Sequence, residues 1–145
     1  MTCKQNYNEV TILLIDDDDV DVMGVKRALK QLKILNPIIR ARDGVEGLAI
    51  IRDTKKQRKS YIVLLDINMP RMDGLEMLYE LRNDPHISNS IVFILTTSKA
   101  DEDKAKAYNQ HIAGYIVKNQ VAEGFVRVVE LLDSYWRLVE LPSQN

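Results

Sequence analysis

Five short apolar runs recur along the chain, and most of them show no regular alternation with polar residues. They span residues 10–15 (VTILLI), 37–41 (PIIRA), 61–65 (YIVLL), 91–95 (IVFIL) and 114–117 (GYIV). Continuous runs of this length, rich in Val, Ile and Leu, are typical of strands that are covered on both faces. The pattern therefore predicts five strands.

Segments with helical spacing follow these runs. In the first of them, about residues 19–32, one helical face carries Val22, Val25, Leu29 and Leu32. Further helices are predicted over about residues 45–53, 75–82, 101–109 and 121–139. Strands that alternate with helices in this way form a parallel sheet with helices on both faces. The pattern thus predicts an α/β fold.

Five aspartates lie close together where the first predicted strand ends. Asp18 or Asp19 can cap the helix that follows, and Asp21 lies favourably near the dipole of its N-terminus. Replacing Asp21 is accordingly expected to lower stability only slightly. Asp16 and Asp17 come directly after the strand and need another explanation, because neighbouring carboxylates repel one another.

The ligand site of an open parallel sheet lies beyond the carboxyl ends of its strands. The residues at those ends are Asp16, Asp17, Asp66, Thr96 and Lys118. Carboxylates without histidine or thiol suit a hard divalent cation such as Mg²⁺, which offsets their repulsion and leaves room for a phosphoryl group. The expected chemistry is phosphoryl transfer to Asp66 as nucleophile. Thr96 would donate to a phosphoryl oxygen, and Lys118 would stabilise the developing charge.

Composition narrows the function classes. The chain has 145 residues, a formal net charge of −1 and one cysteine, Cys3. This charge gives no basic field for nucleic acid or an anionic membrane, and residues 54–60 (TKKQRKS) favour a solvated loop because no aromatic residue is interleaved. One cysteine fits a reducing compartment, and the N-terminus shows no signal peptide or membrane anchor. We expect a single domain over residues 1–145 in the cytoplasm, with neither nucleic acid nor membrane as partner.

Other families that use acidic clusters match the sequence poorly. A calcium loop starting at Asp17 would have Val22 where its glycine belongs and Ala28 where its bidentate glutamate belongs. A phosphatase of the haloacid-dehalogenase type would need an acid two positions after Asp66, where Asn68 stands. No P-loop or Gly-rich dinucleotide motif is present. A binding module that switches without phosphorylation stays open as the alternative function.

Four motifs, in this order, resemble the receiver domain of two-component response regulators over about residues 8–140. They are the acidic pair Asp16-Asp17, the acceptor motif LLDINMPRMDG, the hydroxyl motif ILTTS and the lysine motif YIVK. Thirty residues separate Asp66 from Thr96 and twenty-two separate Thr96 from Lys118, spacings that match the family. The resemblance implies a flavodoxin-like fold, with five parallel strands in the order 2-1-3-4-5 and five helices on both faces.

The resemblance also implies a mechanism. A partner histidine kinase would transfer its phosphoryl group to Asp66 in a Mg²⁺-dependent reaction. Asp17, Asp66 and the backbone carbonyl of Asn68 would ligate the metal, and Asp16 would hold a metal-bound water. Asn68 and Ser98 resemble the positions that tune the lifetime of the phosphoryl group. A protein of this kind loses its own phosphoryl group slowly and is not a conventional enzyme.

Signalling in the family passes through a conformational switch. On phosphorylation, Thr96 would move toward the phosphoryl group and Tyr115 would turn inward, which changes the surface of the fourth helix, fifth strand and fifth helix. One position departs from the family pattern, because Asn119 follows Lys118 where a cis proline is usual. A non-proline cis bond costs about 3–4 kcal/mol, so we expect a different loop geometry there.

The apolar pattern of the helix predicted over residues 121–139 indicates a surface for binding another protein. Its apolar arc covers about half the circumference, wider than the ~100° stripe that one core-facing helix needs, so part of it is expected to face another protein. Packing by the tail VELPSQN is the alternative. The ending SYWRLVELP also resembles single-domain regulators that serve bacterial phytochrome kinases. That resemblance implies a phytochrome-like kinase partner and a homodimer through the fourth helix, fifth strand and fifth helix. We also expect no effector domain, because the sequence ends shortly after the last predicted helix.

Overall fold

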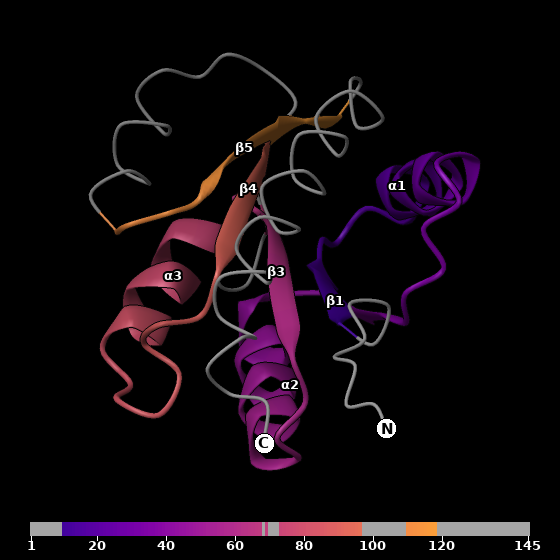
Figure 1. Cartoon of the computed structure of the whole chain (residues 1–145). Coiled ribbons are helices and arrows are strands. Elements are labelled where there is room, and N and C mark those ends of the chain that lie inside the picture. Colours follow the sequence, from indigo (N-terminus) through magenta and orange to yellow (C-terminus); the bar gives the residue numbers. More distant parts are fainter. Residues whose placement is uncertain (1–9, 68, 70–72, 97–109, 119–145) are drawn as a thin grey trace, which may run out of the picture.

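The computed structural model describes residues 10–67, 69, 73–96 and 110–118 (Figure 1). Five parallel strands form one sheet in the order β2-β1-β3-β4-β5, as the family resemblance implied. The strands are β1 (Thr11–Ile15), β2 (Ile38–Ala41), β3 (Tyr61–Asp66), β4 (Val92–Thr96) and β5 (Gly114–Val117). All five predicted strands are thereby confirmed, each within about one residue of its expected ends.

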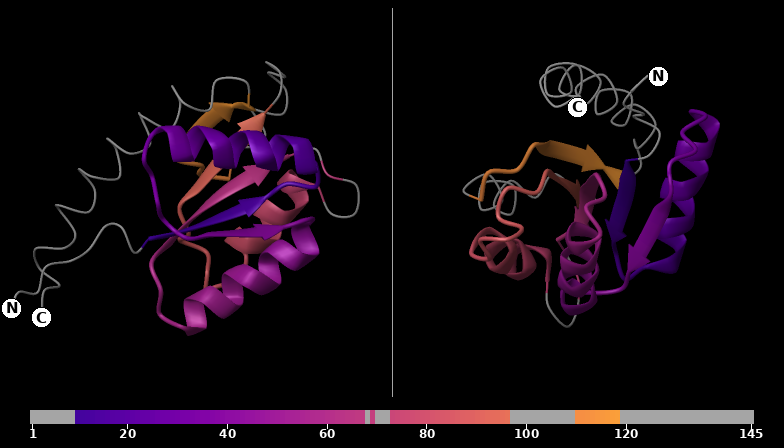
Figure 2. Two further views of the ribbon diagram at one scale, coloured as in Figure 1. Left: turned by 90° about the vertical axis from the view of Figure 1, so that its right-hand side faces the viewer. Right: turned by 60° about the horizontal axis from the view of Figure 1, so that its bottom comes forward.

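Three helices are described, and they cover both faces of the sheet (Figure 2). They are α1 (Asp19–Gln31), α2 (Gly44–Lys56) and α3 (Gly74–Arg82). The helices predicted over residues 101–109 and 121–139 lie outside the described residues. No helix in the described part of the chain is long and apolar enough to cross a bilayer.

The two faces of the sheet bury separate hydrophobic clusters, because successive strand residues point to opposite sides. In β1, Ile12 and Leu14 pack in the cluster that contains the Val25 side chain of α1. Leu13 and Ile15 pack in the other cluster, which contains side chains of α2 and α3. Burial on both faces explains why β1, β3 and β4 have continuous apolar sequences, whereas β2, at the edge of the sheet, is partly exposed.

Helix α2 is longer than its apolar spacing predicted. The sequence predicts a helix over about residues 45–53 followed by a loop, whereas the helix continues to Lys56. The Thr54 hydroxyl donates to the carbonyl oxygen of Ile50 at 2.8 Å, and Lys55 and Lys56 lie at the negative end of the helix dipole. The prediction of a loop from residue 54 was therefore wrong by one helical turn.

Arg82, at the end of α3, ties the helix to the segments that lead into β4 and β5. Its Nε donates to the carbonyl of Gln110 at 2.7 Å and its Nη2 to the carbonyl of His111 at 2.6 Å. Its Nη1 donates to the carbonyls of Ser88 and Ser90 at 2.8 and 2.7 Å. One guanidinium thereby satisfies four carbonyls, and it holds the starts of two strands in place relative to α3.

Gly74 allows α3 to begin very close to the end of β3. A Cβ atom at this position would lie 2.5 Å from Cα of Ile67 and still nearer to the carbonyl oxygen of Asp66. Both contacts involve backbone atoms, which cannot rotate away. The glycine of the acceptor motif therefore permits the backbone of α3 to pack against the backbone that carries Asp66.

We predict that Gly74→Ala lowers the free energy of unfolding by about 1–3 kcal/mol, because the strand end or the helix must shift. Gly24→Ala is the matched control, since a Cβ on this helical glycine meets no atom within 4 Å. That control should raise stability by about 0.5–1 kcal/mol. Urea unfolding of both variants measures the difference, and a Gly74→Ala protein as stable as the wild type would contradict the close approach.

Candidate functional site

The strand register brings the predicted site residues to one edge of the sheet. Ile15 pairs with Leu65, so Asp16 and Asp66 follow at the ends of adjacent strands. Thr96 ends β4 and pairs with Val117 of β5, which places Lys118 one residue beyond that pair. The topology therefore gathers all the strand-end residues at the carboxyl edge, as the sequence predicted.

Asp16, Asp17 and Asp66 form an acidic cluster. Each offers one carboxylate oxygen, and these three oxygens all lie within 4.8 Å of one another. Asp16 is 0% exposed and Asp66 is 3% exposed, whereas Asp17 is more accessible to solvent. Buried carboxylates at this separation repel one another strongly unless a cation lies beside them. The donor set, all oxygen and partly open to water, fits a hard divalent cation.

In the described part of the chain, the Lys118 ammonium is the positive charge that lies beside the acidic cluster. Its Nζ lies 2.8 Å from Asp16 Oδ2, 2.8 Å from Asp21 Oδ2 and 3.3 Å from Asp66 Oδ2. Burial by itself lowers the pKa of Lys118, but the hydrogen bonds to Asp16 and Asp21 and the charges of Asp66 and Asp16 together outweigh it. The net effect raises the pKa above its usual value, so the ammonium stays charged at neutral pH.

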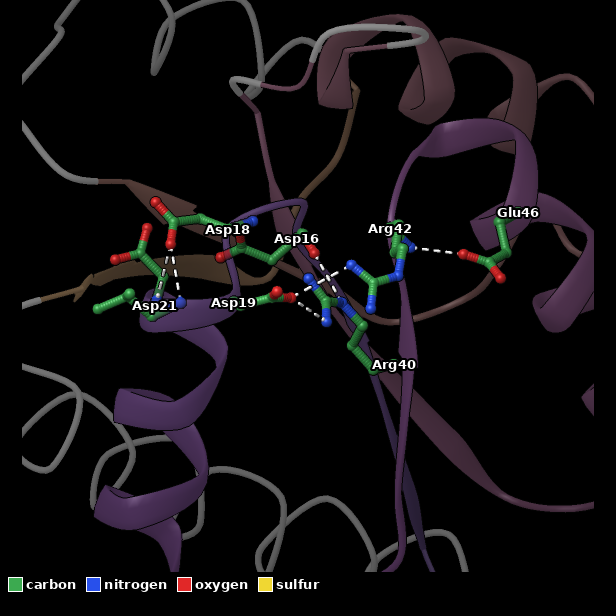
Figure 3. Close-up of polar contacts among 8 residues, drawn as sticks. Asp16, Asp18, Asp19, Asp21, Arg40, Arg42 and Glu46 are labelled. Carbon is green, nitrogen blue, oxygen red and sulfur yellow. Dashed lines mark hydrogen bonds and ion pairs between the residues drawn. The ribbon is translucent and has the colours of Figure 1, made fainter.

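In the turn between β1 and α1, Asp16, Asp18 and Asp19 have different hydrogen-bond partners (Figure 3). Asp16 Oδ1 accepts a hydrogen bond from the backbone N–H of Asp18 at 2.9 Å, which tightens the turn. Asp18 caps α1, because its side chain accepts from the N–H groups of Val20 and Asp21. Of the two caps that the sequence allowed, Asp18 is confirmed.

Asp19 is bound from the side of β2. Arg40 Nη1 lies 2.8 Å and Arg42 Nη1 3.2 Å from Asp19 Oδ1, and these contacts lower the pKa of Asp19, mainly through the hydrogen bond from Arg40. Arg40 Nε also donates to the backbone carbonyl of Asp16 at 3.0 Å (Figure 3). Arg40 therefore connects the site turn to β2, a contact that the sequence pattern did not predict.

Asp21 makes a second site contact that the sequence pattern did not predict. The pattern gives Asp21 only a helix-dipole role, yet its carboxylate accepts a hydrogen bond from Lys118 at 2.8 Å. A signal was present in the spacing, because Asp21 precedes the buried residues Val25 and Leu29 at successive intervals of four. An acid that continues a buried helical stripe toward the strand ends has to meet a partner there.

Tyr115, Asn68 and Ser98 complete the predicted set. Tyr115 is half-buried in β5, pairs with Ile94 and packs against the hydrophobic cluster on the α2 and α3 side. Asn68, Ser98 and Asn119 lie outside the described residues. The structure therefore brings together Asp16, Asp17, Asp66 and Lys118, and it adds Asp21.

The chain matches the family model described as "Response regulator receiver domain" over residues 12–130. Its relatives include the response regulator Rcp1 of Synechocystis, which is 31% identical over 136 residues that cover 91% of this chain and 92% of Rcp1. A solved structure of Rcp1 in its Mn²⁺-bound form superposes with a TM-score of 0.66 at 29% identity, covering 88% of this chain and 94% of that one.

Two further solved structures are similar throughout the fold. The bacteriophytochrome response regulator AtBRR gives a TM-score of 0.73 at 27% identity, covering 84% of this chain and 91% of that one. The phosphorylated cyanobacterial phytochrome response regulator RcpA gives 0.69 at 28% identity, covering 88% and 94%. With the acidic cluster and lysine at the strand ends, these matches show that the chain belongs to the response regulator receiver domain family of two-component signalling proteins.

Proposed function

We propose that Asp66 accepts a phosphoryl group from the phosphohistidine of a histidine kinase. The observation that carries this proposal is Lys118, whose Nζ lies 3.3 Å from Asp66 Oδ2 in a buried edge shared with Asp16 and Asp17. A carboxylate next to an ammonium and a cation-binding cluster combines a nucleophile with the charges that stabilise a transferred phosphoryl group.

In the transfer step, a carboxylate oxygen of Asp66 attacks phosphorus, and a P–O bond forms as the P–N bond to the kinase histidine breaks. The imidazole leaves with the electron pair of that bond and takes up a proton from solvent. Lys118 donates a hydrogen bond toward the incoming phosphoryl oxygens, where charge accumulates. Asp66 is held for this attack because the start of α3 packs against its backbone at Gly74.

The metal of this site is Mg²⁺ in our proposal. Asp16, Asp17 and Asp66 offer the clustered oxygens that support it, and the backbone carbonyl of Asn68 is the further ligand implied by the family. The relative Rcp1 has been solved in a Mn²⁺-bound form, which is in keeping with a divalent ion at such a site. When bound, the ion supplies positive charge that offsets both the acidic cluster and the phosphoryl oxygens.

The output in our proposal is a switched protein-interaction surface. Thr96, at the end of β4, and Tyr115, half-buried in β5, would couple phosphorylation to the surface around β5 and the helices predicted on either side of it. Ser98 and Asn68 would tune how long the phosphoryl group survives, and slow loss of that group would reset the switch. The protein thus acts as a signalling acceptor rather than as a conventional enzyme.

The input partner in our proposal is a phytochrome-type histidine kinase in the cytoplasm. Two solved neighbours, AtBRR and RcpA, are described as phytochrome response regulators, and this supports the assignment. Phosphotransfer from purified candidate kinases to Asp66, compared at short reaction times, is the direct test of the partner.

We predict that Asp66→Asn abolishes Mg²⁺-dependent labelling by acetyl phosphate, because the amide cannot act as the nucleophile. Intact-mass spectrometry detects the added phosphoryl group. Asp53→Asn, an exposed acid of α2, serves as the control and should label like the wild type. Undiminished labelling of Asp66→Asn would refute the assignment, and failure of the wild type itself to label would favour a binding module that works without phosphorylation.

We predict that Asp17→Asn weakens Mg²⁺ binding by at least about tenfold, because it removes one charge from the acidic cluster. Isothermal titration calorimetry measures the affinity. Asp53→Asn is again the matched control. It also removes one negative charge, but Asp53 is an exposed acid of α2 outside the acidic cluster, so the affinity for Mg²⁺ should stay unchanged. Equal affinities for the wild type and Asp17→Asn would place the ion elsewhere.

We predict a homodimer through the surface formed by β5 and the predicted helices at residues 101–109 and 121–139. The support is the wide apolar arc of the last predicted helix, which exceeds what one core-facing side requires. Sedimentation velocity at high micromolar concentration, with and without a phosphoryl mimic, measures the state. A monomer under both conditions would contradict this prediction.

A further inference from the structure

Asp21 is a fourth carboxylate at the site. It is not one of the three acids of the acidic cluster, so the proposed metal site does not explain what Asp21 does. It belongs to the first turn of α1, is 29% exposed, and accepts a hydrogen bond from Lys118 Nζ at 2.8 Å. Lys118 is 97 residues away in sequence, so the contact joins α1 directly to the end of β5. Any effect of Asp21 on the Asp66 carboxylate through this contact is therefore indirect and passes through Lys118.

Lys118 has three N–H donors on a flexible four-carbon stem. Two carboxylate oxygens, on Asp16 and Asp21, lie 2.8 Å from its nitrogen, and the Asp66 oxygen lies at 3.3 Å. The side chain of Lys118 is only 8% exposed, so few water molecules compete for these donors. The two shorter contacts are therefore to residues other than the acceptor Asp66: a hydrogen bond to Asp21 and an ion pair with Asp16.

We propose that Asp21 is a positioning residue that holds the Lys118 ammonium in place for phosphoryl transfer to Asp66. The proposal rests on the proposed function of Asp66. Asp16 restrains the ammonium from the end of β1 and Asp21 restrains it from α1, so its position is defined from two elements. Without Asp21, the flexible stem samples positions in which no donor faces the phosphoryl oxygens, and transfer slows.

A hydrogen-bond role and a charge role for Asp21 predict different results. Asp21→Asn keeps an acceptor oxygen at the same place and removes the charge, whereas Asp21→Ala removes both. If the acceptor positions Lys118, the asparagine variant restores what the alanine variant loses. If the negative charge of Asp21 mainly competes for Lys118, both variants should react faster than the wild type.

The experiment measures the initial rate of labelling by acetyl phosphate at saturating Mg²⁺ and saturating donor. In this reaction an Asp66 oxygen bonds to phosphorus while the donor P–O bond breaks, and acetate leaves with that electron pair. We expect Asp21→Ala to reduce the rate by about threefold to tenfold, and Asp21→Asn to stay within about twofold of the wild type. Circular dichroism verifies that both variants fold.

Asp53→Ala is the control. Asp53 is an exposed acid of α2 that accepts a hydrogen bond from Gln57 and makes no contact with Lys118, so the rate of this variant should match the wild type. Asp66→Asn is included to test the underlying function separately. An Asp21→Ala rate equal to or above the wild type, or an Asp21→Asn rate as low as that of Asp21→Ala, would overturn the proposal while labelling at Asp66 stands.

Discussion

The repulsion among buried carboxylates at the carboxyl edge of the sheet is the constraint on which this site depends. Asp16 and Asp66 are almost completely buried, and their oxygens lie within 4.8 Å of each other and of Asp17. Within the described residues, Lys118 offsets part of that charge through contacts of 2.8 Å and 3.3 Å. The remaining negative charge and the all-oxygen donor set fit a divalent ion at this edge.

Several features of the fold hold this edge together against its own repulsion. Asp18 caps α1 and donates its N–H to Asp16, so the charged turn is anchored by backbone hydrogen bonds. Arg40 binds the Asp16 carbonyl and the Asp19 carboxylate from β2. Gly74 lets α3 approach the backbone of Asp66 more closely than any side chain would permit. Hydrogen bonds, an ion pair and close backbone packing therefore anchor the charged turn and the end of β3.

The local pattern predicted most of the fold because each signal was strong and short in range. Continuous apolar runs predicted all five strands, and a heptad-like stripe of Val22, Val25 and Leu29 predicted α1. The end of α2 was misjudged, since polar Thr54 stays helical through a hydrogen bond to Ile50 that apolar spacing does not reveal. The sequence did not predict that Arg82 donates hydrogen bonds to four backbone carbonyls, because those carbonyls lie in segments that only folding brings together.

By itself, the sequence determined the alternation of strands and helices, the acids and lysine at the strand ends, and through them the family. These follow from residue type, spacing and the rule that parallel strands present their carboxyl ends at one edge. Tertiary structure decided which of five neighbouring aspartates does what: Asp18 caps, Asp19 pairs with β2, and Asp21 bonds to Lys118. Those roles depend on groups far away in sequence, and only the packing of α1, β2 and β5 sets the distances that distinguish a capping, a surface and a site carboxylate.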